Sequence, residues 1–328
     1  MVPFACVFLF SLMLSGAETE NHSSSDLPPV EIKEASLTRD NGERVIPLLI
    51  YLPETPKSKS HPVILFSHGL GGSRQAAFYL GKHWAQQGYI AVFMQHPGSD
   101  ERLWKARNQK EAIQALKSAA NKKQFFNRLD DTKKVLDQLE IWQKEQGHFL
   151  EDRMDLEATG MAGHSFGAIT TQALSGQSFP FIGQGFQDKR IRAAMIMSPG
   201  PAKRGSYEDN FGRVSLPWLL ITGSEDHALF SETMPKDRQK VFDALPEKYA
   251  YMLWLEGATH LSLVNETRND QKAVDTRHLE AIKEISTRFW DAHLKKDPDA
   301  HSYLKSDQVH DFLTGEDQWR HPKPRHLP

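Results

Sequence analysis

Short apolar runs alternate with longer segments of helical periodicity, and this alternation constrains the fold more than any other feature of the chain. The runs cover residues 45–52, 63–67, 89–95, 156–162, 191–198, 218–222 and 251–255. Several are continuously apolar, as is typical of strands covered on both faces. Apolar residues recur at helical spacing within residues 129–142 and 274–294. We therefore expect an α/β fold with a mostly parallel central sheet and helices on both faces.

The N-terminal segment differs in composition from the rest of the chain. Residues 4–14 form an apolar run that is too short to span a bilayer, and small residues follow at 15–17. This pattern predicts a secretory signal peptide over residues 1–17, although no Lys or Arg precedes the run. The alternative is a hydrophobic N-terminal anchor that is never removed. We expect a secreted or periplasmic protein without a stable membrane span after processing.

The remainder of the chain has the charge balance of an ordinary globular protein. Residues 18–30 are polar and predict a disordered lead-in, followed by one domain over 31–304 and a polar extension over 305–328. The formal net charge of −2 and a pI of about 6.7 argue against a nucleic-acid partner. Cys6 is the only cysteine and lies in the N-terminal run. We therefore expect no thiol nucleophile and no metal held by cysteine in the domain.

The stretch Gly163-His164-Ser165-Phe166-Gly167 reads G-x-S-x-G. It follows the apolar run 156–162 and precedes a helical run over 168–174, which is the context that a nucleophile elbow requires. In such a turn the serine hydroxyl projects away from the sheet, and glycines on both sides avoid crowding it. Ser165 is therefore the candidate nucleophile.

A serine hydroxyl needs a base to take its proton and a carboxylate to orient that base. The apolar run 218–222 leads to Asp226, our candidate acid, with the adjacent Glu225 as the alternative. The run 251–255 leads to His260, the candidate base. The chain order Ser165, Asp226, His260 is the order of nucleophile, acid and histidine expected of an α/β-hydrolase.

The negative oxygen of a tetrahedral intermediate needs preorganised N–H donors. We expect the backbone N–H of Phe166 to be one donor. The glycine-rich loop after the run 63–67 supplies the other, with Leu70 as first choice and Gly69 as second. This loop lacks the patterns of phosphate-binding loops. We expect His68 and His164 to support the loops through hydrogen bonds rather than to act as bases.

The chain resembles serine α/β-hydrolases of the dienelactone-hydrolase-like group, and it is similar to platelet-activating-factor acetylhydrolases and chlorophyllases. The residues that carry this resemblance are 66–72, 163–167, 223–226 and 257–260, together with 128–131, 135–137 and 289–294. The resemblance implies the α/β-hydrolase fold, carboxylic ester chemistry and no cofactor. Dienelactone hydrolases themselves use a cysteine nucleophile where this chain has Ser165, so a dienelactone substrate is not expected.

Three functions remain in competition at the level of sequence. The first is an esterase that cleaves small or medium acyl esters through an acyl-enzyme on Ser165. The second is a lipid-directed phospholipase or acetylhydrolase, or a polyester hydrolase, which calls for an exposed apolar rim. The third is a non-catalytic binding module. Residues 97–126, with aromatic and basic side chains, form either a lid or pocket wall, or a surface helix with a solvated basic face.

Overall fold

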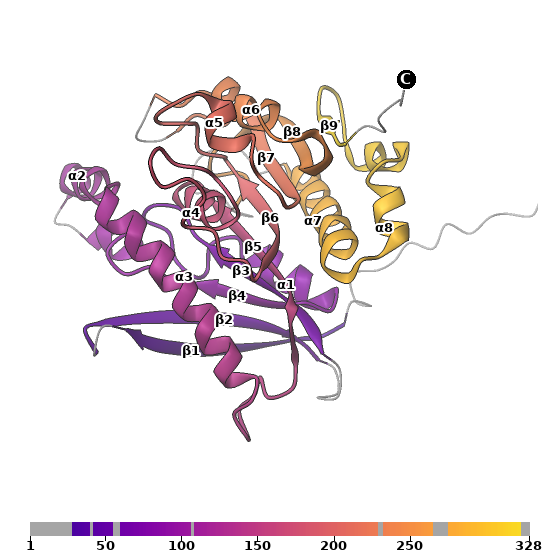
Figure 1. Ribbon diagram of the computed structural model, residues 1–328. Coiled ribbons are helices and arrows are strands. Elements are labelled where there is room, and N and C mark those ends of the chain that lie inside the picture. The colour runs from indigo at the N-terminus through magenta and orange to yellow at the C-terminus, as the bar shows by residue number, and fades with distance from the viewer. Residues whose placement is uncertain are drawn as a thin grey trace, which may run out of the picture.

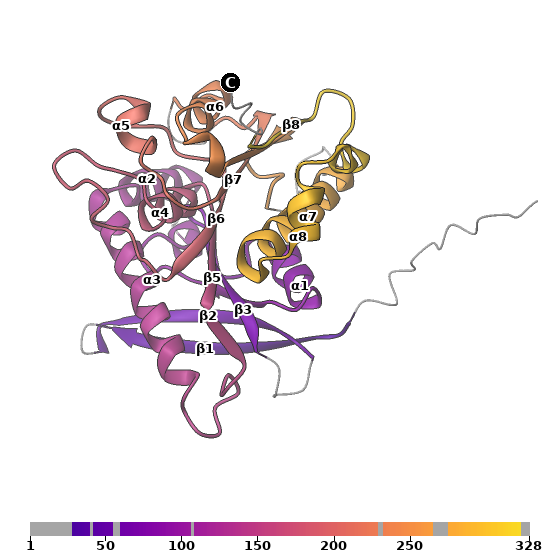
Figure 2. The same ribbon diagram turned by 45° about the vertical axis from the view of Figure 1, so that its right-hand side comes forward.

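The computed structural model of the protein describes residues 28–39, 42–54, 60–105, 108–228, 232–264 and 275–322. The expected signal peptide over residues 1–17, with Cys6, and most of the expected lead-in lie outside these ranges. The described residues form one sheet with helices on both of its faces (Figures 1 and 2). The expected α/β class is therefore confirmed.

Nine strands of the described chain form the sheet in the order β1-β2-β4-β3-β5-β6-β7-β8-β9. Their bounds are Val30–Arg39 (β1), Arg44–Pro53 (β2), His61–Ser67 (β3), Ile90–Met94 (β4), Met154–His164 (β5), Ile191–Met197 (β6), Trp218–Glu225 (β7), Ala250–Thr259 (β8) and Gln318–Arg320 (β9). The six central strands from β4 to β8 pair in parallel. The pairs β1–β2, β2–β4 and β8–β9 are antiparallel. The expectation of a mostly parallel sheet is thus confirmed.

Helices cover the sheet in two layers that Figure 2 separates clearly. On one face lie α1 (Phe78–Gln86), α7 (Thr276–Trp290) and, beside α7, α8 (Pro298–Tyr303). On the other lie α3 (Lys122–Trp142), α4 (Phe166–Leu174), α5 (Tyr207–Phe211) and α6 (Pro235–Asp243). The shorter α2 (Gln109–Ala119) precedes α3, and short helical segments lie at Glu101–Lys105 (η2), Glu247–Tyr249 (η3), Asp291–Lys295 (η4) and Asp307–Phe312 (η5).

Strand β3 shows why the central runs are continuously apolar. Ile64 and Phe66 pack with α1 and α7 on one face. Val63 and Leu65 pack with α3 on the other. Because successive side chains of a strand point to opposite faces, a strand covered on both sides needs an apolar residue at every position.

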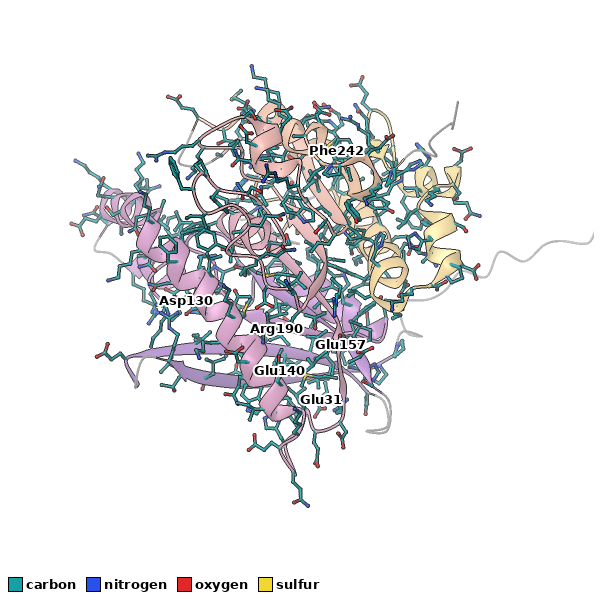
Figure 3. The ribbon with its side chains drawn as sticks, viewed as in Figure 1. Glu31, Asp130, Glu140, Glu157, Arg190 and Phe242 are labelled. Atoms are coloured by element: carbon teal, nitrogen blue, oxygen red, sulfur yellow. The ribbon has the colours of Figure 1, made fainter. Side chains whose placement is uncertain are left out.

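Ion pairs also join helix α3 to the turn before β6. Arg190, in the turn before β6, makes ion pairs of 2.9 Å with Asp137 and Glu140, both on the exposed side of α3. Figure 3 shows Glu140 and Arg190 close together along this helix. Exposed pairs of this kind contribute little individually, so the buried apolar face of α3 supplies most of its stability.

Two edge strands were not expected from the sequence. β1 lies almost wholly within the predicted domain over 31–304, but none of the apolar runs marks it, because its residues are mostly half-buried or exposed. The described part of the predicted polar extension over 305–328 contains a strand, because β9 pairs with β8 and Trp319 is buried. The Trp319 indole N–H donates to the carbonyl of Leu304 at 2.9 Å. Among the described helices, none combines the length and apolarity needed to cross a bilayer.

Candidate active site

Each candidate catalytic residue lies one position beyond the end of its strand. Ser165 follows β5, Asp226 follows β7 and His260 follows β8, while His68 opens the loop after β3. These strands are parallel, so their carboxyl ends meet at one edge of the sheet. Reactive groups in open α/β sheets gather at this edge. The sheet therefore brings together side chains that lie about a hundred residues apart in the chain.

Ser165 occupies a strained turn between β5 and α4. Its φ of 56° and ψ of −113° place it where side chains other than glycine are rare. A Cβ on Gly163 would collide with the carbonyl group of Gly167, and a Cβ on Gly167 would collide with the carbonyl of Ser67. Both glycines of the G-x-S-x-G stretch are therefore required by the close approach of neighbouring backbone.

The side chains of Ser165, His260 and Asp226 form a continuous hydrogen-bonded chain. The Oγ atom of Ser165 lies 2.9 Å from Nε2 of His260. Nδ1 of His260 lies 2.7 Å from Oδ1 of Asp226. Asp226 is fully buried and His260 nearly so, whereas Ser165 is partly exposed and open to a substrate. Glu225, the alternative acid, is exposed and is not the residue against the imidazole.

Asp226 is held in its ionised form by two groups that we did not expect. The hydroxyl of Thr222 donates to Oδ2 at 2.8 Å, and Nε of Arg238 lies 3.1 Å from the same oxygen. Burial alone raises the pKa of Asp226, but the hydrogen bond from His260 and the charge of Arg238 outweigh it and lower the pKa to about 2. The carboxylate therefore stays charged across the range in which a histidine base works.

His164 supports the loop that carries His260. Its Nε2–H donates to the backbone carbonyl of His260 at 2.9 Å, and the two imidazole rings lie 4.7 Å apart between centroids. Burial, together with the proximity of His260, lowers the pKa of His164 to about 3, so its ring stays neutral. A neutral ring in this position adds no repulsion when the neighbouring imidazole takes up a proton.

The two N–H groups predicted to bind the oxyanion belong to backbone segments near Ser165. Phe166 is the first residue of α4, where backbone N–H groups have no partner within the helix. The loop after β3 lies against the nucleophile, since a Cβ on Gly69 would be 3.4 Å from Cβ of Ser165. Nδ1 of His68 lies 2.6 Å from the carbonyl oxygen of Gly69 and thereby anchors this loop. The N–H groups of Leu70 and Phe166 thus come from two segments that approach Ser165.

The segment over residues 97–126 packs on this loop. The indole N–H of Trp104 donates to the carbonyl of Gly71 at 2.9 Å. A Cβ on Gly71 would collide with Trp104 and with Leu116 of α2. Half of Trp104 remains exposed. The described part of the segment therefore contains helices, and Trp104 and Leu116 also pack against the loop after β3.

Several polar residues around the site could not be recognised from any pattern in the sequence. Arg238 lies on α6 and reaches Asp226 across 12 positions of chain. His96 and Ser67 are buried beneath the loop after β3. Arg128 and Asp131 stand in a stretch that carried the resemblance, but no role was assigned to them. Throughout the described ranges, no group of three or more His, Cys, Asp or Glu side chains is arranged to hold a metal ion.

The strand–elbow–helix around Ser165, on a mostly parallel sheet with the candidate acid and base after later strands, defines an α/β-hydrolase. Residues 42–133 match the family model of platelet-activating factor acetylhydrolase, isoform II. The match supports a place in the platelet-activating-factor-acetylhydrolase-like group of serine α/β-hydrolases, which act on ester bonds. It includes the loop after β3 and ends before Ser165. No curated protein matches the chain.

Proposed function

We propose that the protein is a carboxylic ester hydrolase that works through an acyl-enzyme on Ser165. The observation that carries this proposal is the hydrogen-bonded chain from Ser165 through His260 to the buried Asp226, with Ser165 partly open to solvent. Because Nδ1–H of His260 donates to Asp226, Nε2 presents a lone pair to the serine hydroxyl. The imidazole is thus in the tautomer that can accept the serine proton.

In the first half-reaction, the Oγ atom of Ser165 attacks the ester carbonyl carbon as its proton passes to Nε2 of His260. The carbonyl oxygen becomes an oxyanion that accepts hydrogen bonds from the N–H groups of Phe166 and Leu70. The tetrahedral intermediate then collapses, and the bond between the acyl carbon and the alkoxy oxygen breaks. His260 donates its proton to the leaving alkoxy oxygen. The product is an ester of Ser165.

In the second half-reaction, water attacks the acyl carbon while His260 takes one of its protons. Collapse of the second intermediate breaks the bond to Oγ, and the proton passes from His260 to Ser165. The net change is ester plus water to acid plus alcohol. Asp226 stabilises the imidazolium in both steps, and Arg238 together with Thr222 keeps that carboxylate ionised and oriented.

The proposal is tested with a chain-length series of p-nitrophenyl esters on the wild type and on Ser165→Ala. We expect the variant to lose the activity by several orders of magnitude, because removal of one triad member disables the whole unit. Preference for acetyl or butyryl over long acyl chains supports a small-ester substrate. Full activity of Ser165→Ala contradicts the mechanism.

A lipid-directed reaction is the second candidate, and exposed apolar side chains favour it. Phe181 is fully exposed at the tip of the loop after α4, with Ile182 beside it, and Phe126 is half exposed on the first turns of α3. Ring contacts between Phe126 and Phe186 at 5.7 Å join this loop to α3. Exposed apolar side chains of this kind are what docking on a lipid aggregate or a polyester surface requires.

The two candidates differ in their response to substrate aggregation. A lipid-directed enzyme is expected to gain activity when a short-chain phosphatidylcholine passes its critical micelle concentration. Phe181→Ser is then expected to lose that gain while it retains hydrolysis of monomeric p-nitrophenyl acetate. A smooth saturation curve through the critical concentration favours the small-ester enzyme instead.

A further inference from the structure

A second serine–histidine–aspartate arrangement lies beneath the loop after β3. Oγ of Ser67 is 2.9 Å from Nε2 of His96, and Nδ1 of His96 is 3.0 Å from Oδ2 of Asp131. All three side chains are fully buried, so no ester can reach Ser67. These residues therefore do not form a second nucleophilic site, although the order of their atoms repeats that of the candidate triad.

The hydrogen bonds of this buried array run in one direction. Asp131 accepts two bonds from Arg44, at 2.7 and 2.6 Å. Burial raises the pKa of Asp131, but its bonds from Arg44 and His96 lower the pKa overall, so the carboxylate is ionised and accepts from Nδ1–H of His96. Nε2 of His96 is then an acceptor for the hydroxyl of Ser67. The Ser67 oxygen keeps a lone pair for another donor.

That donor is Arg128 on α3, whose guanidinium is fully buried. Its Nη1 lies 3.3 Å from Oγ of Ser67 and donates to the carbonyl of His68 at 2.5 Å. Its Nη2 donates to the carbonyl of Gly69 at 3.3 Å, and its Nε donates to Oγ of Ser99 at 2.9 Å. The guanidinium thus holds two successive carbonyl groups of the loop that lies against the nucleophile.

These two carbonyl groups fix the direction of the loop's N–H groups. The carbonyl of His68 shares a planar, trans peptide unit with the N–H of Gly69, and the carbonyl of Gly69 shares one with the N–H of Leu70. In such a unit the C=O and N–H bonds point in opposite directions. Drawing both carbonyls towards Arg128 therefore turns the N–H groups of Gly69 and Leu70 away from it. These are the two residues that the sequence marks as oxyanion donors.

His68 reinforces the same peptide. Its Nε2 accepts the backbone N–H of His96 at 3.1 Å, so its proton resides on Nδ1 and is donated to the carbonyl of Gly69. Burial and the charge of Arg128 lower the pKa of His68 well below its usual value, and the neutral tautomer is retained. The Gly69–Leu70 peptide is consequently held through its carbonyl by both His68 and Arg128.

We propose that Arg128 is a positioning residue of the reaction, which aims the N–H of Leu70 at the oxyanion by holding the carbonyls of His68 and Gly69 from behind. The inference rests on the proposed function. The Ser67–His96–Asp131 array orients the guanidinium through Ser67. A planar guanidinium spans two neighbouring carbonyls, whereas an ammonium does not. Arg128→Lys therefore keeps the positive charge but no longer fixes the orientation of the two loop peptides.

The test compares Arg128→Lys with wild type in steady-state hydrolysis of p-nitrophenyl acetate and in inhibition by an alkyl trifluoromethyl ketone. We expect kcat to fall about 10²-fold, with KM changed by less than about threefold, because the lost interaction is made in the transition state. The inhibition constant of the ketone, whose adduct carries an oxyanion, is expected to rise by a similar factor. The shape of the pH profile is expected to persist, since His260 and Asp226 are untouched.

Arg153→Lys is the matched control. Arg153 is also buried and donates to a backbone carbonyl, that of Pro53 at 2.8 Å, but it lies away from the site. Its variant is expected to keep the wild-type kcat per titrated active site. If Arg128→Lys does not fold, Ser99→Ala replaces it, because loss of the Nε acceptor is expected to lower kcat about tenfold at unchanged KM.

Two outcomes overturn the inference. One is a folded Arg128→Lys, or Ser99→Ala in its place, with wild-type kcat and ketone inhibition. The other is a loss of activity that disappears once the rate is expressed per titrated active site, so that the folded fraction has the wild-type kcat. Ser165→Ala is assayed in parallel, and full activity of that variant refutes the proposed function itself. An inactive Ser165→Ala beside a fully active Arg128→Lys refutes the positioning role alone.

Discussion

At the scale of single residues, two buried guanidinium groups flank the candidate nucleophile and act on different partners. Arg238 faces the carboxylate of Asp226 and also donates to the backbone carbonyls of Ser198 and Pro199. Arg128 faces the loop after β3. A buried cation is costly unless it is paired or well hydrogen-bonded, and both side chains meet that condition. Ser165 and its candidate partners are therefore surrounded by groups that a substrate need not touch.

The choice of acid is tested by comparing Asp226→Asn with Glu225→Gln. Asn donates where Asp accepts, so Asp226→Asn is expected to place the proton of His260 on Nε2 and to lower kcat by about 10⁴-fold. Glu225→Gln is expected to retain kcat, because Glu225 is exposed and does not bond to the imidazole. Steady-state kinetics with p-nitrophenyl acetate measure both. Collapse of kcat in Glu225→Gln alone refutes the assignment of Asp226.

At the scale of secondary structure elements, both edge strands of the sheet come from segments of mostly polar sequence. β1 pairs with β2 along ten residues, and β9 closes the other edge with three. Trp319 of β9 packs on Tyr251 of β8, with ring centroids 5.9 Å apart. Trp319 and Val309 thus attach the C-terminal segment to the core, although the surrounding sequence is polar. The pattern of that segment gives no periodic signal that would reveal a strand.

Trp319→Ala is expected to lower the free energy of unfolding by about 3–5 kcal/mol, the usual cost of removing a buried large aromatic side chain. Urea denaturation followed by circular dichroism measures the change. Ile141→Ala, at an exposed position of α3, is the control and is expected to change stability by less than about 0.5 kcal/mol. Equal stability of Trp319→Ala and wild type contradicts the view that β9 belongs to the core.

At the scale of the whole molecule, the protein buries several histidines in their neutral form. Burial lowers the pKa of His83 and of His96 to about 4, and that of His164 and of His293 to about 3. In the unfolded chain each becomes protonated as the pH falls through about 6.5, whereas in the folded protein each stays neutral until the pH falls to its lowered pKa. Between these values the unfolded state binds more protons, so stability falls as the pH decreases.

The free energy of unfolding is therefore expected to decrease steadily from pH 6.5 towards pH 4, by about 3 kcal/mol from His83 alone. Urea titrations at half-unit pH intervals measure this slope. His83→Gln is expected to remove the share of His83 and so to make the slope less steep. Thr287→Val is the control, because it removes the hydroxyl 2.9 Å from Nε2 of His83 and leaves the imidazole in place. An unchanged slope in His83→Gln contradicts the assignment.

Local patterns in the sequence determined the parallel sheet, the elbow at Ser165 and the loops that carry Asp226, His260 and Leu70. Each of these depends on a few adjacent residues: a run of apolar side chains, a glycine at a close approach, or a polar residue directly after a strand. Ser165, Asp226 and His260 were therefore recognisable as candidates, because the carboxyl ends of parallel strands meet at one edge. Their catalytic roles stay predictions until the variants are measured.

Only the tertiary structure decided what surrounds those candidates. Arg128 contacts His68 across 60 positions, and Arg44 contacts Asp131 across 87. Trp319 looked like part of a polar tail until its partners on β8 were in place. A buried polar side chain, or a lone aromatic one, contacts residues that lie far away in the sequence. A local sequence pattern cannot reveal these residues, because only the folded chain brings them together. The sequence thus determined which groups could react, and the packing decided which groups hold them in position.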